Sequence, residues 1–304
     1  SNPFQTIQDA VSYIEKQQKS ESTNATWIIS VAEGTYSRFL VPHGVKNITI
    51  QGSGDTTVIN TLDGSPLSVD ESSDGQGIIV WGANITLQNL KIISGTYKKN
   101  MWYASAVGTH DAKGGSGTEV STPVILDHCT FVGQGTGYAF MPQREAFTVQ
   151  NCSFDNYEQA INSACDGYSA NNCKVIHNTI KNCTYAIHGY YGGEGQASAA
   201  MEIANNTISG QPNRFAVIAV QDQHSTGAVK LNIHDNTFSY TIVGGINQRV
   251  TDGDKIISPM SNVLTTNTMR DHSFAVDAYK YSASNYGTTF YAPKQEGKIA
   301  TWYA

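Results

Sequence analysis

The chain has 304 residues and a formal net charge of −6, and only 14% of its residues are charged. Its length allows one large domain with a substantial core. The scattered Lys and Arg argue against nucleic acid as a partner, because phosphate binding needs clustered cations, and no apolar run is long enough to suggest membrane insertion.

The first predicted element is an amphipathic helix over residues 4–18. In FQTIQDAVSYIEK, the residues Ile7, Ala10, Val11 and Ile14 recur at helical spacing. We expect this helix to cap one end of a solenoid, where its apolar face would cover the core and hide an exposed strand edge.

Residues 25–280 repeat one pattern, which is a short alternating strand, a bend and a second short strand. VILDHCTF, FTVQNCSF, KVIHNTI, MEIANNTI and LNIHDNTF are examples. Their succession without hairpin turns or intervening helices predicts stacked coils of parallel strands. We expect one position to form a ladder from coil to coil, held by Ser53, Leu90, Cys129, Cys152, Asn178, Asn206, Asn236 and Asn267. His234 and Asp235 are then predicted to lie at a structural bend.

The opening phrases FQTIQDAV, WIISVAEGTY and VKNITIQGSGDTTVI resemble the start of the pectin-lyase-like superfamily, and the Asn ladder is similar to the one found there. The resemblance covers residues 4–280. It implies an all-β fold, a right-handed parallel β-helix (solenoid) with an N-terminal capping α-helix, in a single domain over residues 1–304. It leaves the function open, because the superfamily includes lyases, esterases, glycosidases, phage tailspikes and adhesins. The catalytic signatures of its pectate lyases, polygalacturonases and pectin methylesterases are missing.

Five cysteines are crowded into the middle of the chain: Cys129, Cys152, Cys165, Cys173 and Cys183. None of their spacings resembles a zinc site of the C-x-x-C type. We expect them to be small buried hydrophobic residues and not a disulfide framework.

A second recurring phrase follows each bend and begins with a small residue. We expect these small residues to form an inward ladder of Ala106, Ala139, Ala160, Ala186, Ala216, Gly244 and Ala275. Polar and aromatic residues follow, and they lead into Gly-rich connections, where function tends to concentrate. The predicted substrate-binding residues are His110, Asp111, Arg144, Tyr190, Tyr191, His224, Arg249 and Trp102. This mixture suits a groove for an oligosaccharide or polysaccharide.

Asp166 and Asp222 are aligned two coils apart in this phrase, and His188 lies between them. Carboxylates on alternate coils would be about 10 Å apart. Inverting glycosidases need a separation of about 6.5–9.5 Å. Asp166, His188 and Asp222 are therefore the predicted catalytic residues of a glycoside hydrolase acting on a host or plant glycan, with a polysaccharide lyase as the second enzyme class. The alternative is a non-catalytic, glycan-binding adhesin region of a bacterial surface protein.

No cofactor and no metal-ligand set is expected, although Asp252 and Asp254 could recruit calcium. The abrupt ends of the sequence lead us to expect a region of a longer multidomain chain. Its expected location is secreted or on the bacterial cell surface. Residues 281–304 lose the repeat and are predicted to form a C-terminal cap or a junction.

Overall fold

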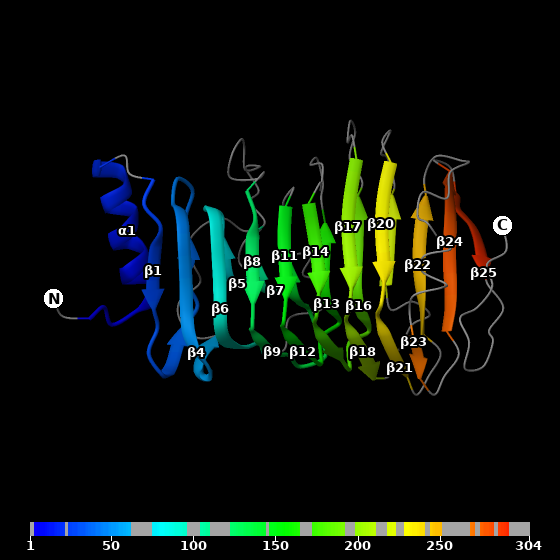
Figure 1. The fold of residues 1–304 in the computed structure, drawn as a ribbon, viewed down its shortest axis with the longest axis horizontal. Coiled ribbons are helices and arrows are strands. Elements are labelled where there is room, and N and C mark those ends of the chain that lie inside the picture. Colours follow the sequence, from blue (N-terminus) through cyan, green and yellow to red (C-terminus); the bar gives the residue numbers. More distant parts are fainter. Residues whose placement is uncertain are drawn as a thin grey trace.

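The computed structural model describes residues 3–21, 24–61, 75–95, 104–109, 122–143, 146–164, 172–191, 198–210, 218–222, 228–240, 244–250, 268–270, 274–282 and 285–291. They form helix α1 (Ile7–Glu21) followed by strands β1 to β25. The strands stack side by side along one long axis, and chain order runs from one end of the stack to the other (Figure 1).

The coils have three faces, which we call A, B and C. Face A contains β1 (Trp27–Ser30), β8 (Val124–Asp127), β11 (Ala146–Gln150), β14 (Asn172–Ile176), β17 (Ser198–Ala204) and β20 (Ala228–His234). Face B contains β2 (Gly34–Ser37), β9 (Thr130–Val132), β12 (Ser153–Asp155), β15 (Thr179–Lys181), β18 (Thr207–Gly210), β21 (Thr237–Tyr240) and β23 (Thr268–Arg270). The long strands β4 (Lys46–Asn60) and β6 (Ala83–Ile93) run through face A and continue into face B.

Face C is a separate sheet. It contains β3 (Leu40–Val41), β5 (Gln76–Val80), β7 (Ser105–Gly108), β10 (Tyr138–Met141), β13 (Gln159–Ala164), β16 (Tyr185–Tyr191), β19 (Ile218–Asp222), β22 (Gly244–Val250), β24 (Phe274–Ser282) and β25 (Asn285–Tyr291). Described neighbours pair in parallel, except that β25 pairs antiparallel with β24 and forms the edge of face C. The all-parallel coils and the helix at one end confirm the predicted fold class, a right-handed parallel β-helix (solenoid) with an N-terminal capping α-helix.

The capping helix begins and ends three residues later than predicted. Thr6 explains the start, because its Oγ1 accepts a hydrogen bond from Asp9 N at 3.0 Å and satisfies a donor of the first turn. The apolar face is as predicted, since Ile7, Ala10, Val11 and Ile14 are all buried. Among the described residues, no helix is long and apolar enough to cross a membrane.

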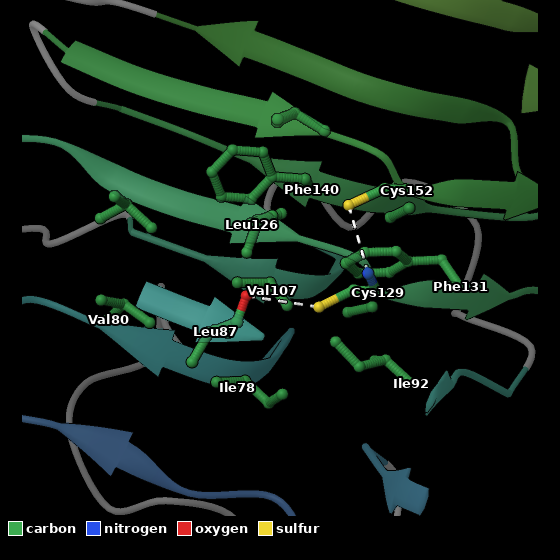
Figure 2. Packing of buried hydrophobic residues seen from close by; sticks show 14 of the residues in the cluster. Ile78, Val80, Leu87, Ile92, Val107, Leu126, Cys129, Phe131, Phe140 and Cys152 are labelled. Carbon is green, nitrogen blue, oxygen red and sulfur yellow. Dashed lines mark hydrogen bonds between the residues drawn. The ribbon is translucent and has the colours of Figure 1, made fainter. Parts of the chain in front are cut away.

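The core lies between the three faces (Figure 2). Leu87 and Leu126 enter it from face A, Phe131 enters from face B, and Val107 and Phe140 enter from face C. Phe131 stacks on Phe154 of the next coil, with ring centroids 4.7 Å apart. The coils are therefore held by continuous apolar packing along the axis.

The predicted Asn ladder is present. Asn178 Nδ2 donates to Asn206 Oδ1 at 3.0 Å, and Asn206 Nδ2 donates to Asn236 Oδ1 at 2.9 Å. Cys129 continues the ladder by placing its Sγ 3.4 Å from the Leu87 carbonyl, which corresponds to the bond from Asn178 Nδ2 to the Val149 carbonyl. The buried amides and thiols thus satisfy backbone groups at every bend of this stretch.

One ladder position was predicted wrongly. Gly54, and not Ser53, pairs with Leu90, because the register of β4 on β6 shifts between Gln51 and Gly54. Asn267 lies outside the described residues. The bend assignment of His234 and Asp235 is confirmed, since His234 pairs with Ala204 at the end of β20 and Asp235 has a φ of 54°.

The small-residue ladder of face C is correct for Ala106, Ala139, Ala160 and Ala186, which are buried. Farther along, Ala275 pairs with Gly245 and not with Gly244, so that alignment was wrong by one residue. Ala216 lies outside the described residues. The prediction for the cysteines holds where it can be compared: Cys129, Cys152, Cys173 and Cys183 are buried and are not joined in disulfides, and Cys165 lies outside the described residues.

Candidate functional site

The predicted substrate-binding residues that the structure describes lie on the later strands of face C. Their backbone register forms two rows that cross four or five strands each. One row is Asn162, His188, Ala219, Asn247 and Asp277, and the other is Tyr190, Gln221, Arg249 and Tyr279. The rows are two residues apart on each strand. Residues of the amide, imidazole, phenol, guanidinium and carboxylate types therefore occupy neighbouring register positions on consecutive coils.

Two of the predicted catalytic residues have a described backbone position. His188 pairs with Ala219, whereas Asp222 pairs with Tyr191. Asp222 is thus three residues beyond the partner of His188, an offset of about 10 Å along the strand. Tyr190 is two residues from His188 on the same strand, and Arg249 belongs to the row of Tyr190, two coils farther along.

The remaining candidates lie outside the described residues, and their roles stay predictions. They are Asp166, His110, Asp111, Arg144, His224 and Trp102, together with Asp252 and Asp254 of the suggested calcium site. Among the described residues, no group of three or more His, Cys, Asp or Glu side chains could hold a metal ion.

A partly buried polar cluster lies on β10 and β13, next to the row that contains His188. Burial raises the pKa of Tyr138, the nearby charge of Glu158 raises it further, and a hydrogen bond with Asn162 opposes the shift. The Tyr138 phenol therefore remains protonated at neutral pH and available as a donor. Asn162 is 7% exposed, and its Oδ1 has no hydrogen-bond partner.

Sequence reasoning did not assign a role to Tyr138 or Gln159, although both precede an alanine of the small-residue ladder. Tyr138 and Gln159 pair with each other, and Gln159 pairs with Tyr185 on the next coil. A polar or aromatic residue recurs immediately before the ladder alanine. This recurrence was the signal that could have identified the row of Tyr138, Gln159 and Tyr185.

A hollow lies at the capped end, far along the chain from these rows. It has a volume of about 440 Å³ and lies between α1 and the first strands, where Phe4, Tyr13, Trp27 and Tyr36 line it. It is lined by none of the predicted catalytic or substrate-binding residues.

No protein-family model and no curated protein matches the sequence. Among solved structures, the chain is similar to a pectin methylesterase from Aspergillus niger, with 15% identity, a TM-score of 0.41, and coverage of 94% of this chain and 84% of that one. It is also similar to the carrot pectin methylesterase (12% identity, TM-score 0.39, coverage 98% and 82%) and to that of Yersinia enterocolitica (12%, 0.35, 98% and 86%). These values assign no site residue and no reaction to this chain.

Proposed function

We propose that this protein binds an extended glycan across the later coils of face C, from β13 to β24. The observation that carries the proposal is the pair of register rows that contain His188, Tyr190, Gln221, Asn247 and Arg249. Adjacent coils present these residues at intervals of about 4.8 Å. Amides can donate to and accept from sugar hydroxyls, tyrosines can stack on sugar rings, and an arginine can bind the carboxylate of an acidic sugar.

We also propose that the bound glycan is hydrolysed, with Asp166 and Asp222 as the acid and the base. In an inverting reaction, one carboxylic acid protonates the glycosidic oxygen while the other carboxylate activates a water molecule on the opposite side of the sugar. The resemblance of the opening phrases to a superfamily that includes lyases, esterases and glycosidases supports a carbohydrate as the ligand class.

The second candidate is a non-catalytic glycan-binding region of a bacterial surface protein. The offset between His188 and Asp222 favours it, because two of the three predicted catalytic residues are separated along the strand, whereas a catalytic set has to converge on one bond. A flat row of amides, tyrosines and an arginine needs no such convergence to bind a glycan.

A glycan array and a sugar-release assay on the same preparations distinguish the two candidates. We expect the wild-type protein to bind a subset of glycans and to release sugar from them. The Asp166→Asn, Asp222→Asn double variant should bind the same glycans and release nothing. Binding without release by the wild-type protein would support the adhesin, and the absence of any glycan binding would refute both candidates.

A further inference from the structure

Strand β1 has a free edge at the capped end of the solenoid. In the described part of the chain, its hydrogen-bonded neighbour is β4 alone. Val31 N, directly after the strand, donates to the Gln51 carbonyl at 2.8 Å. The main-chain groups of successive strand residues point to opposite edges, so Ile29 also faces β4. The N–H and C=O groups of Ile28 and Ser30 therefore point away from β4.

This free edge borders the hollow of about 440 Å³ at the capped end. Strand β1 lies between α1 and β4 (Figure 1), so the side away from β4 is the side of the helix. Ile28 and Ser30 both line the hollow, together with residues of α1. Its volume is within the range of about 300–1,000 Å³ that is usual for ligand sites. The main-chain groups of the free edge thus face a space that a ligand can fill.

Exposed apolar side chains gather around the same hollow. Among the described residues, the large hydrophobic side chains that are exposed are those of Phe4, Tyr13 and Ile28, and all three line the hollow. Ile28 is 64% exposed, and the rings of Phe4 and Tyr13 lie with their centroids 5.4 Å apart. Exposed apolar side chains that are grouped, in contrast to scattered ones, mark interaction sites.

We infer that a short extended segment of a partner polypeptide binds here as an added strand on the free edge of β1. Unpaired N–H and C=O groups at strand spacing are complementary to an extended main chain, which offers acceptors and donors at the same interval. An apolar side chain of the segment next to Ile28 covers its exposed surface. Because α1 lies beyond β1 at this end of the stack, a single segment can reach the edge and a folded sheet cannot (Figure 1). The inference does not depend on glycan binding at face C.

Fluorescence anisotropy with a labelled peptide and the whole chain tests the site. The probe consists of three Val-Thr repeats with a lysine at each end, because valine and threonine favour the extended conformation. We expect saturable binding. Two control peptides carry methyl groups on main-chain nitrogens, one on the valines and the other on the threonines. Only one set of nitrogens faces β1, so one control should bind at least tenfold more weakly, and the other should stay within about threefold of the parent peptide.

Variants of the free edge test the geometry. Ser30→Pro removes an N–H that points away from β4, a position at which an edge strand tolerates proline, and should weaken binding at least tenfold. Ser30→Ala is the matched control, because it keeps the N–H and should bind like the wild type. Ile28→Lys adds a charge to the apolar edge and should also weaken binding at least tenfold, which tests the site independently if Ser30→Pro does not fold. Hydrogen exchange of the Ser30 amide should slow in the complex.

Three outcomes would overturn the inference. Absence of binding by the wild type, or wild-type affinity in folded Ser30→Pro and Ile28→Lys, would remove the site. Equal binding of both methylated peptides and their parent would exclude strand addition. Self-association of the wild type that Ser30→Pro abolishes, measured by sedimentation, would make the occupant a second copy of this chain and not a partner segment.

Discussion

The side chain of Gln18 pairs with the main chain of Lys46 in the way that a neighbouring strand would. Gln18 Nε2 donates to the Lys46 carbonyl at 2.6 Å, and Lys46 N donates to Gln18 Oε1 at 3.0 Å. Gln8 makes the same pair of bonds with Leu40, at 3.2 and 2.8 Å. The capping helix therefore covers the apolar core and also satisfies backbone groups at the open edges of β3 and β4.

Replacing Gln18 with leucine should destabilise the protein by about 1–3 kcal/mol, because the N–H and C=O groups of Lys46 would both lose their partner under a buried side chain. Urea unfolding monitored by circular dichroism measures the change. Gln17→Leu is the matched control on the same helix and should change the unfolding free energy by no more than about 0.5 kcal/mol. Equal effects of the two substitutions would contradict the role of Gln18 at the strand edge.

The Asn ladder predicts a larger effect at a single position. Asn206 Nδ2 donates to the Val175 carbonyl at 2.8 Å and to Asn236 Oδ1 at 2.9 Å, and its Oδ1 accepts from Asn178. Asn206→Ala should cost at least about 2 kcal/mol, since buried groups on two neighbouring coils lose partners. Denaturant melts of Asn206→Ala and of Asn205→Gly, an exposed left-handed position that glycine tolerates, provide the comparison. A loss confined to the glycine variant would be inconsistent with the ladder.

A buried hydroxyl pair joins two coils at face B. The Tyr157 hydroxyl lies 2.7 Å from Ser94 Oγ, and both residues are buried. Tyr157→Phe keeps the ring packing but removes one member of the pair, so we expect a loss of about 1–2 kcal/mol in the free energy of unfolding. Ser94→Ala in the phenylalanine background should recover part of this loss, because the unpaired hydroxyl is then gone. A double-mutant cycle without coupling would argue against the bond.

Cys183 predicts how stability changes at alkaline pH. Burial raises the pKa of its thiol to about 12, from an ordinary value of 9.0. Below pH 9 the thiol is protonated in both the folded and the unfolded chain and contributes no pH dependence. Between pH 9 and 12 the unfolded chain gives up this proton first, so the folded state loses stability as pH rises, by on the order of 4 kcal/mol at the upper limit.

Cys183→Ala removes this titration. Chemical unfolding at pH 8, 9.5 and 10.5 should therefore show that the stability advantage of the wild-type protein over Cys183→Ala shrinks as pH rises. Cys183 is 6% exposed, and the cost of the deleted sulfur is the same at every pH, which makes the slope the informative quantity. A constant difference across this range would contradict the raised pKa.

The coil repeat could be predicted from the sequence because the packing at each bend demands a narrow choice of residue. Asn178, Asn206 and Asn236 fill one such position, and their spacing along the chain is enough to align their coils. The alignment failed at Ser53, where β4 contains an irregularity that short phrases do not reveal. The contacts of Gln18 were also out of reach, since a polar residue on an amphipathic helix does not indicate which backbone edge it meets.

The candidate site was less predictable than the fold. The recurrence of polar residues on successive strands of face C follows from the repeat. The relation between His188 and Asp222 depends on a register that a small-residue ladder does not fix. A displacement of one residue moves a side chain to the other side of a sheet. Asp127 likewise accepts hydrogen bonds from Gln88 and Asn151 on the two neighbouring coils, and the sequence VILDHCTF alone gives no sign of these contacts.

The central claim is that a glycan binds at face C. It is tested most directly by an equilibrium titration with the glycan that binds most strongly on the array. Three proteins are compared side by side: the wild type, the Tyr190→Ala, Arg249→Ala double variant and Tyr13→Ala. Tyr13 is an exposed tyrosine of the capping helix, far along the stack from β16 and β22, and is the matched control (Figure 1). The account predicts at least a tenfold loss of affinity in the double variant and wild-type affinity in Tyr13→Ala. Wild-type affinity in the double variant, with its fold intact by circular dichroism, would contradict glycan binding at face C.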